Sequence, residues 1–246
     1  MKKRPSRSRD KEEVRTQIFD ATSLPVDINP IKRVIKVKQF PWTQKQKEFF
    51  KIALDRDTKV VFVEGPAGTS KSLLSVYCGL QLLNMKVISD IMYLRSAVES
   101  SDSRLGYLPG SAEDKLRFYN MPFLDKLDEL LENTRIERLE QEGRISMFPV
   151  NFARGMDWKN KCIILDEAQN STCKEITTVL TRLGAGSKCF VLADPMQTDL
   201  RNEKLCGGFN TMYTTFSDDE SIDMGIHTFR FTEDDIIILE LCKFII

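Results

Sequence analysis

The sequence predicts an α/β fold with a mostly parallel β-sheet and helices on both faces of the sheet. Two observations lead to this prediction. Short apolar runs alternate along the chain with longer segments of helical periodicity, and that alternation is typical of parallel sheets. The strongest apolar run, residues 60–63, continues into a glycine-containing loop and then into a helical pattern, which is the context of a phosphate-binding loop. The 246 residues are enough for one large domain with its own core.

We divide the chain into a basic N-terminal extension, residues 1–40, and a domain at residues 41–246. The extension is predicted to be partly flexible, because Pro25 and Pro30 interrupt any regular element. Its lysines and arginines fit either a disordered terminus or a segment that contacts phosphate backbones, and both interpretations stay open. The domain begins with a helix from Thr43, where apolar residues recur at helical spacing.

The remaining elements continue the alternation. The strand at residues 60–63 precedes a helix over residues 73–83, and a second strand covers residues 91–94. A helical pattern then runs over residues 113–142, and we expect a break near Pro122 because proline removes a backbone donor from a helix. Further strands are expected at residues 145–150, 162–165, 189–192 and 226–231.

The composition and the charge argue against several classes of protein. The net charge is zero, so the overall charge argues neither for nor against a nucleic-acid partner. No apolar run approaches the ~20 residues of a membrane span, and the basic N-terminus lacks the apolar run of a secretory signal. The six cysteines are scattered without a C-x-x-C pair, and Cys162 and Cys189 are predicted to be buried small hydrophobes. We therefore expect a cytoplasmic protein with no membrane partner, no zinc site and no disulfide framework.

The most informative motif covers residues 60–72. It fits the Walker A pattern G-x-x-x-x-G-K-[ST] at every position except one, where Ser70 replaces the last glycine. Lys71 is expected to reach the outer phosphates and Ser72 to hold Mg²⁺, so ATP with Mg²⁺ is the predicted ligand. The predicted phosphate-binding residues are Gly65, Pro66, Ala67, Gly68, Thr69, Ser70, Lys71 and Ser72. The alternative is an ordinary glycine-rich turn.

A second motif, residues 162–169, is an apolar strand that ends in two acids, the arrangement called Walker B. The acids are expected at the carboxyl edge of the sheet, where ligands bind in open α/β sheets. Asp166 is predicted to hold Mg²⁺ through water, and Glu167 to polarise the attacking water. The next strand is followed by Gln197, which is placed to sense the γ-phosphate; a plain turn carrying Asp-Pro is the alternative there.

Together these motifs resemble the PhoH-like family of phosphate-starvation-inducible ATPases. The resemblance covers nearly all of residues 44–235. Its most specific parts are the Leu-Gly-Tyr-Leu-Pro-Gly turn at residues 105–110 and the Asp-Glu-Ala-Gln-Asn string at residues 166–170. It also includes Gly65 to Thr69, Arg95 to Glu99, Arg154-Gly155, Leu180 to Gly184, and Asp194 with Gln197 and Asp199. The compact length is similar to the versions found in bacteriophages.

The resemblance implies a RecA-like core related to the N-terminal domain of superfamily 1 helicases. By that likeness Gln44 would contact adenine, with Phe40 and Trp42 stacked near it. A helix-start glutamine that faces solvent is the alternative for Gln44, and the two interpretations stay open.

Two departures from the family pattern bear on activity. Ser70 stands where the family usually has glycine, and a serine held at positive φ costs on the order of 1 kcal/mol. Ile238 stands where the family tends to place an arginine, a residue able to act as the γ-phosphate finger. Three arginines remain as candidate substitutes, with a surface salt bridge as the alternative for each: Arg154, Arg182 and Arg230.

Three functional hypotheses follow. The first is a Mg²⁺-dependent ATPase, coupled to single-stranded RNA or DNA, whose subunits form a homo-oligomeric ring and supply an arginine in trans. The second is a nucleotide-binding switch or scaffold with little or no hydrolysis, which Ser70 and Ile238 favour. The third is a small-molecule kinase, for which the sequence has no evident acceptor site. The basic N-terminus with Tyr107, Phe118 and Tyr119 fits a nucleic-acid surface, but packing of the long helix explains these aromatics equally well.

Overall fold

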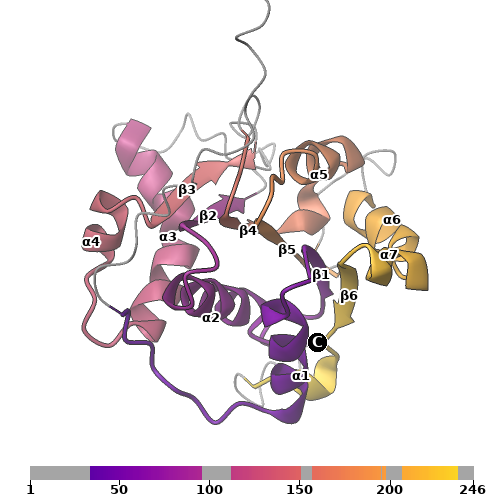
Figure 1. Cartoon of the computed structure of the whole chain (residues 1–246), viewed down its shortest axis with the longest axis horizontal. Coiled ribbons are helices and arrows are strands. Elements are labelled where there is room, and N and C mark those ends of the chain that lie inside the picture. Colours follow the sequence, from indigo (N-terminus) through magenta and orange to yellow (C-terminus); the bar gives the residue numbers. More distant parts are fainter. Residues whose placement is uncertain (1–33, 96–111, 151–156, 195, 198–206, 238–246) are drawn as a thin grey trace, which may run out of the picture.

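The computed structural model describes residues 34–95, 112–150, 157–194, 196–197 and 207–237, with the backbone alone at 112–119. Six strands form a single sheet in the order β3-β2-β4-β5-β1-β6, and every pair is parallel (Figure 1). The predicted α/β class is therefore confirmed, and the arrangement is consistent with a RecA-like P-loop fold. The strands are β1 (Val60–Glu64), β2 (Asp90–Arg95), β3 (Ile145–Pro149), β4 (Lys161–Asp166), β5 (Lys188–Ala193) and β6 (Ile226–Arg230).

Helices cover both faces of the sheet. One face packs against α1 (Gln44–Leu54), α2 (Lys71–Asn84), α3 (Ala112–Leu130) and α4 (Ile136–Gln141). The other face packs against α5 (Cys173–Leu180) and α6 (Gly208–Thr215), while the short α7 (Asp219–Asp223) precedes β6. Successive residues of β5 alternate between the two cores, because side chains of a strand point to opposite faces; Phe190 joins the first and Val191 the second.

The predicted break near Pro122 is wrong, because α3 continues through Pro122 to Leu130. Phe123, Leu127 and Leu130 are fully buried on this helix. Burying three such side chains gains roughly 1.5–3 kcal/mol each, which exceeds the ~3 kcal/mol that a proline costs in a helix. The helix ends at Leu130, and Leu131 forms an antiparallel bridge with Val37; a second helix, α4, then covers Ile136–Gln141 within the predicted range.

The last residues of the predicted N-terminal extension pack on the domain. Lys38 donates its backbone N–H to the Leu130 carbonyl at 2.8 Å. The Asn84 side chain exchanges two hydrogen bonds with the backbone of Ile35, at 2.8 and 2.9 Å, and Ile35 is buried. These contacts tie residues 35–38 to the ends of α2 and α3, while residues 1–33 lie outside the described part of the chain.

Two further expectations concern cysteines and membranes. Cys162 and Cys189 are fully buried in the sheet, as predicted, and burial raises the pKa of both thiols well above the ordinary value. None of the helices in the described ranges combines the length and the apolar character needed to cross a bilayer.

Candidate nucleotide site

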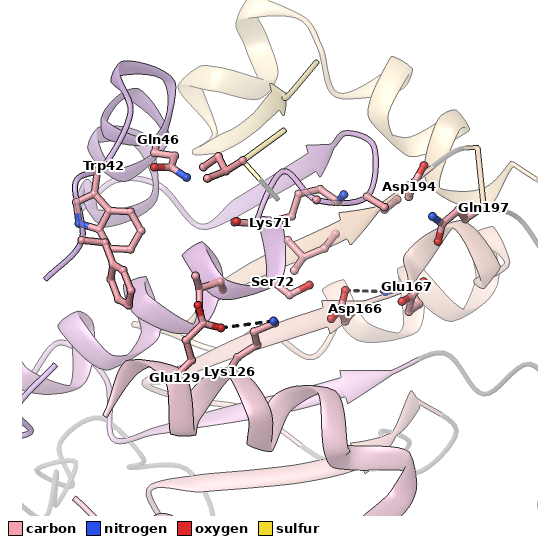
Figure 2. Close-up of a pocket in the computed structure, with 18 of the residues that line it drawn as sticks. Trp42, Gln46, Lys71, Ser72, Lys126, Glu129, Asp166, Glu167, Asp194 and Gln197 are labelled. Carbon is pink, nitrogen blue, oxygen red and sulfur yellow. Dashed lines mark hydrogen bonds and ion pairs between the residues drawn. The ribbon is translucent and has the colours of Figure 1, made fainter. Parts of the chain in front are cut away.

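A cavity of about 460 Å³ opens at the carboxyl edge of the sheet. Its walls come from the β1–α2 loop, the ends of β4 and β5, and residues of α1 and α3 (Figure 2). The predicted residues Lys71, Ser72, Asp166, Glu167 and Gln197 all line it. The fold therefore brings together side chains that lie more than a hundred residues apart in the sequence.

Lys71 is the first residue of α2 and lies under the phosphate loop. Its ammonium donates to the carbonyl oxygens of Gly65 at 2.6 Å and Pro66 at 2.8 Å. Burial lowers the pKa of Lys71, and the negative charges of three nearby carboxylates oppose this shift. Those carboxylates belong to Asp194, Asp166 and Glu167. A partly buried cation beside the start of a helix is the arrangement expected of an anion-binding site.

The residues of the phosphate loop do not all line the cavity. Ala67, Gly68, Ser70, Lys71 and Ser72 line the cavity. Gly65 and Pro66 line a second hollow of about 420 Å³ on the other side of the loop. Thr69 is fully buried and donates its hydroxyl to the Pro66 carbonyl at 2.8 Å, so its side chain fixes the loop.

Ser70 has a left-handed backbone, with φ 63° and ψ 22°. We expected strain for a serine held at positive φ, and Ser70 has this conformation. The Ser70 side chain makes no capping hydrogen bond at the start of α2. Gly65 is required for a different reason: a Cβ atom there would lie 2.8 Å from Cβ of Phe231.

Asp166 ends β4 and is nearly buried. Its Oδ2 accepts a hydrogen bond from the Tyr93 hydroxyl at 2.8 Å, and its Oδ1 accepts one from the Glu167 backbone at 3.0 Å. Burial, and then the Asp166 charge, raise the pKa of Tyr93 well above its ordinary value, so the phenol stays a donor. Figure 2 shows the Ser72 hydroxyl pointing toward this carboxylate.

Ser72 and Asp166 provide a hydroxyl and a carboxylate, the oxygen donors that suit Mg²⁺. No cluster of three or more His, Cys, Asp or Glu side chains that could hold a metal occurs among the described residues. Mg²⁺ bound at substrate phosphates takes only one or two protein ligands. The donor set is thus compatible with a magnesium–nucleotide complex.

Glu167 lies at the mouth of the cavity with a left-handed backbone, φ 56°. Its Oε2 accepts from the Gln169 amide at 2.6 Å, and its Oε1 lies 3.7 Å from Nη2 of Arg95 on β2. Gln197 reaches the cavity from the segment after β5, and its backbone carbonyl accepts from the same Gln169 amide at 3.3 Å. The ends of β4 and β5 are therefore connected through one side chain.

Gln44 does not lie in the cavity. Its side chain is on the exposed side of α1 and donates to Glu48 at 3.5 Å, which agrees with the solvent-facing alternative. The glutamine that lines the cavity is Gln46, two residues further along the helix, next to Phe40 and Trp42. The Oε1 atom of Gln46 accepts from the Thr43 backbone at 2.9 Å (a capping box), and Figure 2 shows its amide nitrogen directed toward the cavity.

The arginine candidates do not line the cavity within the described part of the chain. Arg230 pairs with Glu64 at 2.7 Å and lines the second hollow. Arg182 donates to the Thr178 carbonyl at 2.7 Å and lies at the opposite, amino-terminal edge of the sheet. Arg154 lies outside the described residues.

Sequence reasoning assigned no role to several residues that build the site. Gln169 and Tyr93 hold the two acids, and Lys126 and Glu129 of α3 line the cavity, with Nζ and Oε2 3.7 Å apart. Gln169 carried a signal, because it lies within the Walker B string. Lys126 carried none, because its position depends on how α3 packs against α2.

The chain is similar to proteins of one family. A family described as PhoH-like protein matches residues 38–246. A PhoH-like protein of Synechocystis sp. is 36% identical over 174 residues, which are 71% of this chain and 51% of that protein. A PhoH-like protein of Bacillus subtilis is 39% identical over 158 residues, 64% of this chain and 49% of that protein. Protein PhoH of Escherichia coli is 30% identical over 187 residues, 75% of this chain and 51% of that protein. The chain thus spans about half the length of these curated relatives.

Proposed function

The chain belongs to the PhoH-like family, and we propose that it binds ATP with Mg²⁺ in the cavity and hydrolyses it. The family is one of nucleotide-binding P-loop proteins. One observation carries the proposal: the phosphate loop and the two acids at the end of β4 line the same cavity, at the sheet edge where α/β proteins bind ligands.

Lys71 and the start of α2 would hold the outer phosphates. The Lys71 ammonium donates to two loop carbonyls, and a phosphate oxygen would replace them with a stronger, charge-assisted hydrogen bond. Burial lowers the pKa of Lys71 and so disfavours its protonated form. A phosphate anion beside the amine would act in the opposite direction and favour the protonated form. The positive end of the α2 dipole supports the same anion.

Ser72 and Asp166 would hold the Mg²⁺ ion of the nucleotide. When bound, the ion would neutralise charge on the phosphates and polarise the phosphoryl oxygens as a Lewis acid. The Tyr93 hydroxyl would keep Asp166 in place through its 2.8 Å hydrogen bond. Glu167 would polarise the attacking water, and Gln197 would sense the γ-phosphate from the neighbouring strand end.

A nucleotide-binding switch with little hydrolysis is the second candidate. Two observations favour it: the left-handed backbone of Ser70, and a cavity lining that contains no arginine among the described residues. An arginine that contacts the transferred phosphate is worth roughly 10³–10⁵ in rate in other P-loop enzymes, so its absence in cis would leave slow turnover. Both acids would then serve nucleotide binding alone.

Coupling to single-stranded RNA or DNA extends the first candidate. A second copy of the chain would have to supply the missing arginine, so we propose a ring of subunits. Light scattering with ATP and single-stranded nucleic acid tests this part, and a chain that stays monomeric under those conditions would contradict it. Three aromatic residues were considered above for stacking on bases: Tyr107, Phe118 and Tyr119. The structure does not describe the side chain of any of the three.

The experiment is an ATPase assay on wild type, Lys71→Ala and Glu167→Gln, each with Mg²⁺ or with EDTA. We expect turnover by wild type that requires Mg²⁺ and is lost in both variants. Binding of ATP should weaken in Lys71→Ala but persist in Glu167→Gln. Wild type that binds ATP without turnover would instead support the switch. Addition of single-stranded RNA or DNA shows whether either polymer accelerates hydrolysis.

A further inference from the structure

Gln169 is the buried centre of the polar network around Glu167. Only 5% of its surface is exposed. Its Nε2 atom donates to Oε2 of Glu167 at 2.6 Å and to the Gln197 carbonyl at 3.3 Å. Its Oε1 atom accepts from the backbone N–H of Asp194 at 3.1 Å. One amide therefore contacts the acid after β4 and the backbone after β5.

The orientation of this amide is determined by its partners. A backbone N–H can only donate, so the side-chain atom that faces Asp194 must be the oxygen. The nitrogen must then face Glu167 and the Gln197 carbonyl, which both accept. Among the natural side chains of this length, only glutamine offers an acceptor on one side and two donors on the other.

Gln169 lies closer to the Glu167 carboxylate than Arg95 does. Nη2 of Arg95 lies 3.7 Å from Oε1 of Glu167, which is beyond hydrogen-bond length, and both side chains are partly exposed. The 2.6 Å contact from Gln169 is a short hydrogen bond to a carboxylate, and its donor belongs to a buried side chain.

We propose that Gln169 is a positioning residue that holds the Glu167 carboxylate in a fixed position relative to Gln197 and thereby sets the rate of ATP hydrolysis. This inference rests on the proposed function. Glu167 must face the attacking water while Gln197 faces the γ-phosphate, and the two residues belong to different strand ends. Gln169 hydrogen-bonds to both segments, to Glu167 after β4 and to Asp194 and Gln197 after β5.

The test compares two variants. Gln169→Met has a similar volume but neither donor nor acceptor, and its kcat is expected to fall by about 10- to 100-fold with little change in KM for ATP. Gln169→Glu keeps an acceptor for Asp194 but places a second carboxylate against Glu167. It loses the donors to Glu167 and to the Gln197 carbonyl, so its kcat should fall at least as far as that of Gln169→Met, again with little change in KM for ATP.

Gln81→Met is the matched control, because Gln81 is a half-buried glutamine on α2 that does not line the cavity. It should keep the wild-type kcat and KM. The inference is overturned if Gln169→Met loses thermal stability without losing kcat, or if Gln169→Glu keeps the wild-type kcat. If Gln169→Met does not fold, the kcat of Gln169→Glu decides alone. A wild type without turnover would instead refute the proposed function, so the two failures are distinguishable.

Discussion

Ser70→Gly should stabilise the protein, because it removes a strained residue from the phosphate loop. A left-handed conformation costs a non-glycine residue roughly 1–2 kcal/mol, and Ser70 has φ 63°. Glycine has more freedom in the unfolded chain, which offsets about 0.4–1 kcal/mol of the gain. The lost hydroxyl matters little, because it makes no capping hydrogen bond. The middle values of these two ranges differ by about 0.8 kcal/mol, so the free energy of unfolding should rise by about that amount.

For a chain of this size that gain corresponds to a rise of about 1–4 °C in Tm, measurable by calorimetry without nucleotide. Two controls separate strain from other effects. Ser70→Ala keeps the Cβ atom at positive φ and should give no such rise. Lys86→Gly relieves the same conformation, φ 58°, at an exposed residue just after α2, and should raise Tm without changing the KM for ATP.

Ser70 also lines the cavity, so glycine removes side-chain atoms from the face that phosphates would contact. The KM for ATP of Ser70→Gly is expected to fall as well. The reasoning is refuted if Ser70→Ala stabilises the protein as much as Ser70→Gly does. It is also refuted if Lys86→Gly gains stability while Ser70→Gly gains none, since the same backbone conformation would then cost stability at Lys86 but not at Ser70.

Three further predictions concern other parts of the site. Gly65→Ala should destabilise the protein by about 1–3 kcal/mol in urea unfolding, because the new Cβ would lie 2.8 Å from Phe231; an unchanged midpoint would mean that the loop shifts freely. Gln46→Leu should weaken ATP binding in titration calorimetry, whereas Gln44→Leu should not, and the reverse result would restore the sequence-based assignment. Burial lowers the pKa of Lys71, so between that pKa and 10.5 the unfolded chain binds more protons and Lys71 makes stability rise with pH. Lys71→Met should lack this alkaline rise, and parallel stability–pH curves for the two proteins would count against the burial argument.

The fold and the loop were predictable because their signals are local or periodic. Strand–helix alternation depends on which residues are apolar, and each strand that was predicted pairs in the parallel sheet. The long helix was less predictable. Burial of Phe123, Leu127 and Leu130 outweighs the cost of Pro122, and burial of this kind depends on tertiary packing. Its true end depends on pairing with Val37, which is distant in sequence.

The glutamine that lines the cavity was missed although the sequence held a signal for it. Residues two apart on a helix differ by about 200° in direction, so Gln44 and Gln46 point to nearly opposite sides. Thr43-x-x-Gln46 is a capping-box pattern, and the structure contains that box. A residue whose side chain folds back to the helix start lies beside the segment that enters the helix. Here that segment carries Phe40 and Trp42, which also line the cavity.

Two residues that line the cavity have a strained backbone, and the sequence could reveal only one of them. Four non-glycine residues have positive φ in the described part of the chain, and two of them, Ser70 and Glu167, line the cavity. Ser70 was detectable, because the Walker A pattern calls for glycine at that position. Nothing in the sequence marks Glu167, since an acid after a strand fits an ordinary extended backbone equally well. Its left-handed turn directs the carboxylate toward Gln169, so the surrounding hydrogen bonds must hold a conformation that the residue itself disfavours.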